Sequence, residues 1–265
     1  MKTIFITGAS TGLGKATAQL FQNKGWKVIA TMRNPEAGAE LSVLENVTVL
    51  PLDVTNPEQI KSTVNQVLEA GDIDVVFNNA GYGLLGPVEA LTDEQIVRQL
   101  DTNLLGVIRV TQAFIPYFRE KKSGMFISTT SIGGLIAFPL NSIYHATKWA
   151  LEGWSESLAF ELNQFGVDVK TVSPGGIKTD FVSRSLDSAT SPAYEEMTNS
   201  LFSKMEGMME AASSPEQIAE VVYEAATDGK QKLRYVAGED AKALYAQRLE
   251  LGDEAFRDQL GKQFI

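Results

Sequence analysis

The sequence has no cysteine and only one histidine, His145, among its 265 residues. Without cysteine the chain cannot form disulfides, thiolate nucleophiles or cysteine-ligated metal sites, and this absence fits a reducing compartment. We therefore expect a cytoplasmic protein. A single histidine also argues against a metal site built on imidazole ligands, so the sequence predicts no bound metal.

Long apolar runs and an excess of positive charge are missing as well. No stretch approaches the roughly 18 uninterrupted apolar residues of a membrane-spanning helix. The apolar opening of the chain ends at Thr7 and Gly8 with no cleavage-like A-x-A sequence after it, which argues against a signal peptide. The formal net charge of -10 provides no surface suited to neutralising phosphates. We expect neither a nucleic-acid partner nor a membrane partner.

The composition that is present is ordinary for a globular protein, because 44% of the residues are hydrophobic and 21% are charged. A chain of this length can bury a substantial core as one α/β domain, so we expect a single domain over residues 1–265. Residues 180–213 have the weakest regularity and are rich in serine, methionine and aromatics. They predict a loop or helical region that binds an apolar substrate, or else a helical pair packed on the core.

Short β-rich runs alternate with longer helical patterns along the chain, which is typical of a parallel sheet covered by helices. The pattern predicts strands at 2–7, 26–31, 47–52, 73–77, 124–129, 167–172 and 233–236. Helical periodicity is clearest at 13–24, 56–70, 93–120, 142–165 and 214–227. The predicted fold class is therefore α/β, a doubly wound Rossmann fold with a seven-stranded parallel sheet and helices on both faces.

The segment TGASTGLG at positions 7–14 directly follows the first predicted strand and admits two interpretations. Gly8, Gly12 and Gly14 would let a tight turn and a helix N-terminus approach a pyrophosphate. Alternatively, G-A-S-T-G matches the nucleophile elbow of a serine hydrolase, with Ser10 as the nucleophile. That enzyme needs a histidine base in a late loop, whereas the only histidine lies within a predicted helix. The phosphate-binding interpretation is favoured, and a purely structural glycine turn stays open.

The end of the second predicted strand bears on the choice of cofactor. An Asp or Glu about 20 residues past the glycines usually holds a free ribose 2′-hydroxyl. Here the chain has Met32 and Arg33, and its next acid is Glu36. An arginine suits a 2′-phosphate, and a charge-assisted contact of about 1.5 to 3 kcal/mol would favour NADP over NAD by roughly ten- to a hundredfold. A solvated surface arginine is the alternative.

Two further strand ends reach the same edge of the predicted sheet. The third strand ends in PLDVT, where Asp53 could meet an adenine amino group or cap the following helix. The fourth ends in VVFNNAGYG, where Asn79, Ala80 and Gly81 offer small and amide side chains. Because the carboxyl ends of parallel strands meet at one edge, four consecutive strand ends converge on one nucleotide.

Tyr144 and Lys148 stand four residues apart in a predicted helix, so they share one face. An ammonium about 4 Å from a phenol, at an effective dielectric of about 20, supplies about the 4 kcal/mol needed to bring a tyrosine pKa from about 10 toward 7. Tyr117 and Lys121 have the same spacing. Only Tyr144 has a serine thirteen residues before it, Ser131, which follows the strand MFISTT. A hydroxyl at the carboxyl end of a strand favours Tyr144 and Lys148 as the reactive pair.

Seven segments follow one another along the chain at defined spacing: TGASTGLG, DVT at 53–55, NNAG at 78–81, NLLG with Asn103, STTSIGG with Ser131, YHATK at 144–148 and PGGIKT at 174–179. In this order and spacing they resemble the motifs of the short-chain dehydrogenase/reductase family over nearly the full chain. Thr130 before Ser131 departs from the family pattern, because many relatives have serine there, and we expect no effect from this difference.

The resemblance implies a catalytic tetrad of Asn103, Ser131, Tyr144 and Lys148. Ser131 would hydrogen-bond the substrate oxygen, and Tyr144 would give it a proton during reduction. Lys148 would lower the pKa of Tyr144 and anchor the nicotinamide ribose, and Asn103 would hold a water that relays protons to Lys148. The expected cofactor contacts, from the motifs together with the resemblance, are Gly8, Ser10, Thr11, Gly12, Leu13, Gly14, Arg33, Asp53, Val54, Asn79, Ala80, Gly81, Tyr144, Lys148, Pro174, Gly175, Ile177 and Thr179.

The sequence therefore predicts an NADP(H)-dependent oxidoreductase that interconverts a carbonyl and a secondary alcohol on a fairly apolar small molecule. A non-catalytic NADP(H)-sensing Rossmann module is the main alternative, and an intact tetrad argues against it. Apolar residues on the 93–120 and 142–165 helices suggest a homo-oligomer, a dimer or a tetramer, although two buried helices in a monomer would look the same. We interpret His145 as a packing or hydrogen-bonding residue, because consecutive helix positions point about 100° apart.

Overall fold

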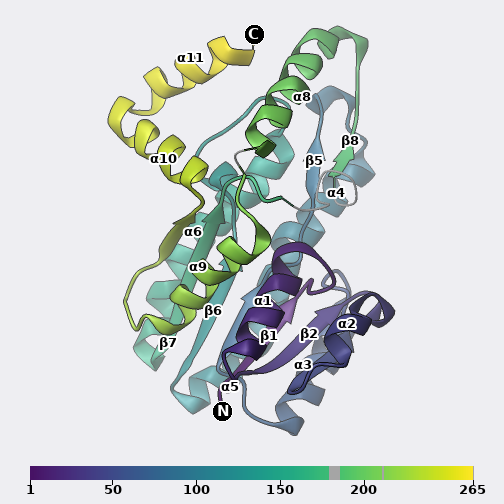
Figure 1. Cartoon of the computed structure of the whole chain (residues 1–265), viewed down its shortest axis with the longest axis vertical. Coiled ribbons are helices and arrows are strands. Elements are labelled where there is room, and N and C mark those ends of the chain that lie inside the picture. The colour runs from purple at the N-terminus through teal and green to yellow at the C-terminus, as the bar shows by residue number, and fades with distance from the viewer. Residues whose placement is uncertain (179–185, 211, 265) are drawn as a thin grey trace.

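A parallel β-sheet forms the centre of the molecule (Figure 1), which is a computed structural model that describes residues 1–178, 186–210 and 212–264. Within these residues the sheet has seven strands in the order β3-β2-β1-β4-β6-β7-β9, and every neighbouring pair is parallel. The predicted α/β doubly wound fold is confirmed. The strands are β1 (Thr3–Thr7), β2 (Lys27–Met32), β3 (Val47–Pro51), β4 (Val75–Asn78), β6 (Gly124–Thr129), β7 (Val167–Pro174) and β9 (Arg234–Ala237).

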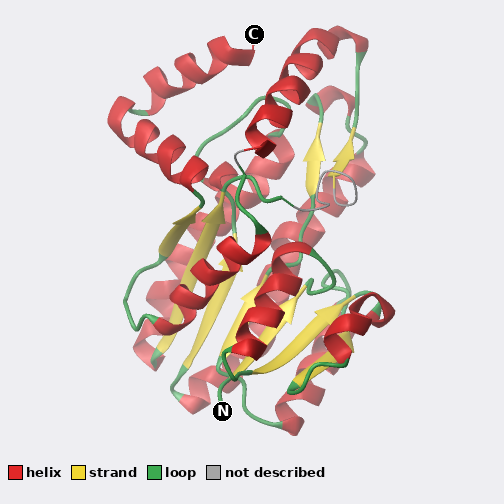
Figure 2. Cartoon of the chain, in the orientation of Figure 1, coloured by secondary structure: helices red, strands yellow, loops and turns green. Residues whose placement is uncertain are grey.

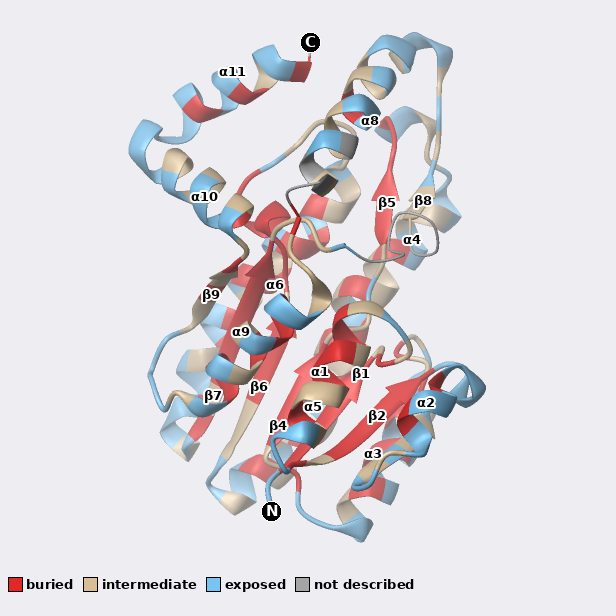
Figure 3. Ribbon diagram, viewed as in Figure 1, coloured by how far each residue is buried: buried red, intermediate tan, exposed pale blue. Residues whose placement is uncertain are grey.

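The central strands are buried along most of their length because helices cover both of their faces. All five residues of β1 are buried, and Figure 3 shows the inner strands almost entirely in the buried colour. Successive side chains of a strand point to opposite faces. Ile4 and Ile6 accordingly join one apolar cluster, whereas Phe5 between them joins another.

Helices cover both faces of the sheet. Phe21 of α1 (Gly12–Asn23) and Val222 of α9 (Pro215–Thr227) pack in the cluster of Ile4 and Ile6. The opposite cluster takes side chains from α3 (Pro57–Ala70), α5 (Gly106–Lys121) and α6 (Ser142–Leu162). A short helix, α2 (Ala39–Ser42), precedes β3.

The helix ends follow the signals in the sequence. Asn56 accepts a hydrogen bond from the Gln59 N–H at 3.0 Å, and Pro57 begins α3. Ser214 and Gln217 form a reciprocal capping box at the start of α9. Gly166 ends the 3₁₀ turn after α6 at a φ of 71°, a left-handed conformation that favours glycine.

The predicted helix over 93–120 is not one regular helix. The structure has α4 (Asp93–Leu100), a π-helical turn at Asp101–Leu105 and then α5. A π turn takes one more residue than an α turn and shifts the phase of the following face, which apolar periodicity does not reveal. The turn contains Asn103, whose side chain is buried.

Several elements lie above the carboxyl ends of the strands, toward which the arrows point in Figure 2. A separate two-stranded parallel sheet joins β5 (Gly83–Leu85) to β8 (Leu186–Ser188), and these three-residue strands were not predicted. The least regular stretch of the sequence contains a helix, α8 (Glu195–Glu210). Two further helices without a prediction, α10 (Glu239–Leu251) and α11 (Asp253–Phe264), end the described chain.

These outer helices share a third apolar cluster with the segment that follows β6. Leu201 of α8 and Phe264 of α11 are buried with Ile132 and Leu135. The rings of Phe138 and Phe264 meet edge to face with centroids 6.3 Å apart. In the part of the chain that the structure describes, no helix combines the length and the apolar character needed to cross a bilayer.

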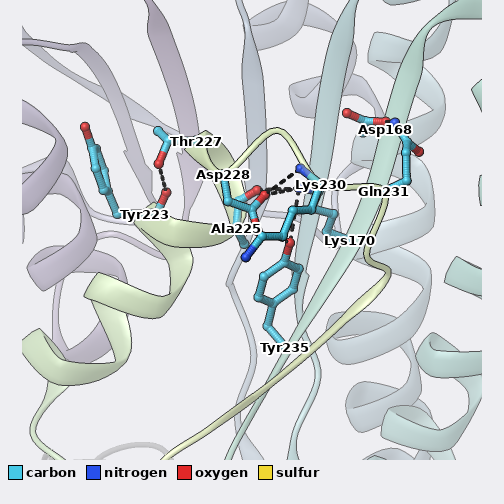
Figure 4. A network of polar contacts seen from close by, with 9 residues as sticks. All are labelled: Asp168, Lys170, Tyr223, Ala225, Thr227, Asp228, Lys230, Gln231 and Tyr235. Carbon is cyan, nitrogen blue, oxygen red and sulfur yellow. Dashed lines mark hydrogen bonds and ion pairs between the residues drawn. The ribbon is translucent and has the colours of Figure 1, made fainter.

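A buried lysine of β7 connects this strand to the end of α9 and to β9 (Figure 4). Nζ of Lys170 in β7 donates to the carbonyl oxygen of Ala225 at 2.8 Å and to Oδ1 of Asp228 at 3.0 Å. The Tyr235 hydroxyl donates to Oδ2 of Asp228 at 2.7 Å. Burial alone would raise the pKa of Asp228, but hydrogen bonds from the Lys230 N–H, Tyr235 and Lys170 outweigh it and lower the pKa to about 2.

We predict that Lys170→Met lowers the free energy of unfolding by about 3 kcal/mol, because Asp228 loses a buried cationic partner. The folded pKa of Asp228 is about 2 against an ordinary value of 3.8, so the unfolded chain takes up this proton first as the pH falls. The contribution of Asp228 is therefore complete above about pH 4 and is lost toward pH 2, and the variant flattens this acid dependence. Urea denaturation at several pH values measures both effects.

Lys232→Met provides the matched control, because Lys232 is exposed and its Nζ lies 4.3 Å from the ring centroid of Tyr235. This variant should change stability by less than about 1 kcal/mol. Equal losses in the two variants would contradict a special role for Lys170.

Candidate active site

The turn after β1 brings two chain segments too close for side chains to stand between them. Gly8 has a φ of 68°, and a Cβ on it would lie 2.7 Å from Cα of Ala80. A Cβ on Gly14 would overlap the carbonyl oxygen of Gly8 and lie 2.6 Å from Nδ2 of Asn79. Both positions therefore require glycine, because the ends of β1 and β4 and the start of α1 pack directly against each other.

Asn79, at the end of β4, holds the glycine turn in place. Its Nδ2 donates to the carbonyl oxygen of Gly8 at 3.1 Å. The Thr7 hydroxyl accepts hydrogen bonds from the backbone N–H groups of Asn79 at 3.0 Å and of Ala80 at 3.1 Å. Asn79 and Ala80, predicted as cofactor contacts, therefore act here as the frame of the turn.

The N-terminus of α1 is arranged to receive an anion. Thr11, its N-cap residue, makes no capping hydrogen bond with its side chain among the described residues, and the first turn contains no acid. By contrast, Asn56 and Ser214 cap α3 and α9. Free N–H groups at a helix N-terminus attract phosphate. Leu13 is buried in the core beneath, so only its backbone can contact a ligand.

The serine hydrolase interpretation of the same segment is wrong, because His145 has no free nitrogen to act as a base. Its Nδ1 hydrogen-bonds the carbonyl oxygen of Gly133 at 2.6 Å, and its Nε2 accepts from the Phe138 N–H at 2.9 Å. Burial lowers the pKa of His145, which keeps the ring neutral. The interpretation of His145 as a hydrogen-bonding residue is confirmed, and it braces the segment that follows Ser131.

Arg33 lies directly after β2 and is exposed. It forms no ion pair with any described residue. The nearby cation of α1, Lys15, is instead bound by Glu40 at 2.5 Å. Among the described residues, Arg33 therefore has no acidic partner, whereas Lys15 has one.

Of the two alternatives for Asp53, the helix cap is wrong, and the adenine contact stays a prediction. Oδ1 of Asp53 accepts from the N–H of Thr55 at 2.9 Å and from its hydroxyl at 2.7 Å. Asp53 thus stabilises the turn, and Asn56 rather than Asp53 caps α3. Val54 is buried, and a Cβ on Gly106 would lie 2.9 Å from its Cγ2. A cofactor would meet Val54 mainly through its backbone.

Ser131, Tyr144 and Lys148 meet at the carboxyl end of β6. The Tyr144 side chain is hydrogen-bonded to Ser131. Nζ of Lys148 lies 5.7 Å from the centroid of the Tyr144 ring and donates to the carbonyl oxygen of Thr129 at 2.9 Å. Oγ of Ser131 also accepts from the Gly133 N–H at 3.0 Å. The structure thus brings together the hydroxyl, the phenol and the ammonium that the spacing predicted.

The two ionisable groups of this cluster shift in opposite directions. Burial raises the pKa of Tyr144, and the hydrogen bond from Ser131 opposes this only in part. Burial lowers the pKa of Lys148 to about 8, although the charge of Glu152 acts to raise it. In this structure the phenol is therefore held in its protonated form, and the expected lowering of its pKa by Lys148 is not present.

Asn103 uses both ends of its amide to hold Tyr82. Oδ1 accepts from the Tyr82 N–H at 3.0 Å, and Nδ2 donates to the Tyr82 carbonyl oxygen at 2.8 Å. A Cβ on Gly81 would lie 3.1 Å from Oδ1 of Asn103. The side chain is therefore committed to the segment after β4. A relay water at this position would depend on the backbone of the π turn, where the regular helical hydrogen bonding is interrupted.

The second Tyr-Lys pair lies at the opposite edge of the sheet. The Tyr117 hydroxyl donates to Oδ1 of Asp72 at 2.9 Å and accepts from the Ile73 N–H at 3.1 Å. Nζ of Lys121 contacts Oδ1 of Asp74 at 3.1 Å. These partners precede β4, so Tyr117 and Lys121 stabilise its amino end and are remote from the glycine turn.

The segment after β7 is tied to the C-terminal part of the chain. The Gly176 N–H donates to Oδ2 of Asp240 at 2.8 Å, and a Cβ on Gly175 would overlap that carboxylate. Ile177 pairs with Ser213 in a parallel bridge. Pro174 ends β7, and Thr179 lies outside the described residues. The sequence provided no signal for Asp240, because its partner is distant along the chain.

Glu152 is a buried acid that the sequence interpretation did not include. It stands four residues after Lys148 and eight after Tyr144 on α6, so the same helix face continues to it. Its carboxylate accepts hydrogen bonds from Thr130 at 2.6 Å and from Arg234 at 2.8 Å. An acid at that spacing was a visible signal in the sequence. The expectation that threonine in place of serine at position 130 has no effect stays a prediction, because a serine hydroxyl can make the same contact.

Known proteins resemble this chain over most of its length. Residues 2–189 match the family described as short chain dehydrogenase. An uncharacterized oxidoreductase of Schizosaccharomyces pombe is 39% identical over 235 residues, which are 87% of this chain and 100% of that protein. Human 17-beta-hydroxysteroid dehydrogenase type 1 is 34% identical over 265 residues, 93% of this chain and 80% of that protein.

Solved structures show the same architecture. A short-chain dehydrogenase from Streptomyces avermitilis superposes with a TM-score of 0.87 at 32% identity, covering 98% of this chain and 95% of that one. ElxO with NADP bound superposes with a TM-score of 0.76 at 25% identity, covering 91% of this chain and 99% of that one.

We predict that Gly14→Ala weakens binding of NADPH by at least about tenfold and destabilises the fold by about 1 to 3 kcal/mol, because the new Cβ forces the glycine turn and Asn79 apart. Isothermal titration calorimetry and urea denaturation measure the two effects.

Gly153→Ala is the matched control. Gly153 lies in α6 with no atom within 4 Å of an added Cβ, so this change should leave binding unaltered and stabilise the helix by up to about 1 kcal/mol. Unimpaired NADPH binding by the Gly14→Ala variant would contradict a role for the turn in holding the cofactor.

Proposed function

Because this chain belongs to the short-chain dehydrogenase family, we propose that it is an NADP(H)-dependent oxidoreductase that interconverts a carbonyl and a secondary alcohol. The observation that carries the proposal is the cluster of Ser131, Tyr144 and Lys148 at the carboxyl end of β6. This cluster occupies the sheet edge at which α/β proteins bind their ligands.

The glycine turn and its surroundings fit a dinucleotide. The turn around Gly8 and Gly14 admits a close backbone approach, and α1 directs uncapped N–H groups toward the same place. Arg33 supports NADP as the cofactor, because its exposed guanidinium can pair with a 2′-phosphate. The NADP bound to ElxO supports the same choice. When bound, the nicotinamide would supply the hydride that adds to the carbonyl carbon.

Each residue of the cluster has a separate role at the carbonyl oxygen of the substrate. The Ser131 hydroxyl hydrogen-bonds this oxygen and places it against the phenol of Tyr144. Tyr144 donates its proton to the oxygen. Lys148, fixed by the Thr129 carbonyl, presents a positive charge to the phenolate that remains. Asn103 holds the Tyr82 segment beside the π turn. A water bound by the backbone of this turn would return a proton to Lys148.

We infer that the substrate is a fairly apolar small molecule. Ile132 and Leu135 lie within four residues after Ser131, and Leu186 and Met205 pack against their apolar cluster. Leu186 and Met205 come from the stretch 180–213, which the sequence predicts as a substrate-binding region. The name of the human hydroxysteroid dehydrogenase, a relative of this chain, points to substrates of that kind.

A homo-oligomer, either a dimer or a tetramer, belongs to the same proposal. Large apolar side chains are exposed on α4 and α6, with Val97 54% exposed and Phe160 79% exposed. Exposed apolar side chains of this size are suited to contact with a second copy. The lack of cysteine supports a cytoplasmic location.

We predict that Tyr144→Phe reduces kcat for NADPH-dependent carbonyl reduction by about 10² to 10⁴-fold while NADPH binding is preserved, because only the proton donor is removed. Turnover is measured from the loss of NADPH absorbance with a panel of aldehydes, diketones, steroids and sugars. Calorimetry measures NADPH binding. Tyr117→Phe is the matched control, since Tyr117 has the same spacing to a lysine and should leave turnover unchanged.

Equal activity of the wild type and the Tyr144→Phe variant would remove Tyr144 from the mechanism. NADPH binding without any turnover across the panel would instead favour the cofactor-sensing module.

We predict that Arg33→Ala raises the KM for NADPH by roughly ten- to a hundredfold and changes the KM for NADH little, because only NADPH carries the 2′-phosphate. Steady-state kinetics with both cofactors measure the selectivity. Lys61→Ala, at an exposed lysine of α3, makes the same change in net charge and should leave both constants unaltered. An unchanged ratio of the two constants in the Arg33→Ala variant would exclude Arg33 from cofactor selection.

A further inference from the structure

Glu152 is buried within the protein behind the reactive pair, with 4% of its surface exposed. A buried carboxylate is costly unless several donors satisfy it. Besides the hydrogen bonds from Thr130 and Arg234, Glu152 accepts from the Ser173 hydroxyl at 2.9 Å and from the Thr171 hydroxyl at 3.3 Å. Two donors from β7, one from β9 and one from the residue after β6 therefore converge on one acid of α6.

The donors to Glu152 lie next to residues of the candidate site. Thr130 directly precedes Ser131, and its hydroxyl oxygen lies 2.9 Å from the hydroxyl oxygen of Ser173. Ser173 directly precedes Pro174, where the segment that meets Asp240 begins. A shift of the Glu152 carboxylate would therefore displace the ends of β6 and β7 together.

Glu152 also sets the balance of charge around Lys148. Lys148 faces Tyr144 and Glu152 on its own helix and the carbonyl oxygen of Thr129 on β6. Arg234 of β9 forms an ion pair with Glu152 at 2.8 Å. The remaining charged or titratable groups that act on Arg234 are Glu156 of α6 and Tyr245 of α10. The buried carboxylate is thus paired directly with one cation, Arg234, and stands one helical turn from a second, Lys148.

We propose that Glu152 is a positioning residue for carbonyl reduction, which holds Lys148 in its charged form and fixes the ends of β6 and β7 that carry Ser131 and Pro174. This inference rests on the proposed function, because it concerns the same Lys148. Arg234 limits the effect by sharing the carboxylate, so the charge on Lys148 depends on the Glu152–Arg234 pair.

The two members of the pair predict opposite changes at Lys148. Glu152→Gln keeps an oxygen that accepts from Thr130 and Ser173, but it removes the negative charge that acts on both Lys148 and Arg234. The pKa of Lys148 should then fall from about 8 by about one pH unit. Arg234→Gln leaves Glu152 without its second cation, so the pKa of Lys148 should rise by about half a pH unit. A purely structural role for Glu152 does not predict pKa changes of opposite sign at Lys148 in the two variants.

The experiment is an NMR titration of lysine labelled with ¹³C at Cε, in the cofactor-free full chain. The Lys148 signal is assigned from its loss in a Lys148→Met variant. The pH profile of kcat/KM for carbonyl reduction is recorded in parallel, and its alkaline limb should move to lower pH in Glu152→Gln and to higher pH in Arg234→Gln. Glu161→Gln removes an exposed acid from the same helix and should move neither measurement.

An unchanged Lys148 titration in both variants, or shifts of the same sign, would overturn the inference. If Glu152→Gln does not fold, the Arg234→Gln titration decides the question alone, since a rise supports the inference and no rise contradicts it. The Tyr144→Phe variant separates the two proposals. Full activity of that variant would defeat the proposed function, whereas its inactivity together with an unmoved Lys148 titration would defeat only the role of Glu152.

Discussion

The close approach of the ends of β1 and β4 is the constraint on which the rest of the candidate site depends. The sheet order reverses between these two strands, and ligands of open α/β sheets bind where this happens. Thr7 receives two N–H groups from the end of β4, and Gly8 fits there because it has no Cβ. Asn79 extends the frame by accepting from the Thr129 hydroxyl at 3.3 Å, and the Thr129 carbonyl in turn holds Lys148. The cofactor turn and the reactive lysine therefore share one hydrogen-bonded frame.

Two buried lysines show how the same side chain serves stability in one place and chemistry in another. Lys170 is 1% exposed and directly paired with Asp228, so its charge is neutralised where it lies. Lys148 is 6% exposed and hydrogen-bonded to a carbonyl group, with its acid one helical turn away. The ion pair with Asp228 offsets the desolvation of Lys170. Lys148 has no direct ion pair among the described residues, so its desolvation lowers its pKa, and nearby charges can change this pKa.

Strong local signals made most of the fold predictable. Strand bounds agree with the structure within about two residues, because apolar runs ending at Gly or Pro are local features. The short strands β5 and β8 escaped prediction because three residues carry no measurable periodicity. The π turn at Asn103 escaped because the apolar pattern continues through it. α10 and α11 bury few side chains against the sheet, so their patterns are weak.

The sequence by itself determined the parallel α/β fold, the glycine turn, and Ser131, Tyr144 and Lys148 as a set. These features are encoded by residue type and by spacing within single elements, or by the rule that parallel strands end at one edge. Only the tertiary structure decided that His145 braces a loop and that Asn103 holds Tyr82. It also decided that Glu152 joins three strands behind Lys148. Hydrogen bonds between distant segments and the burial of charges depend on which segments pack together, and no local pattern records this.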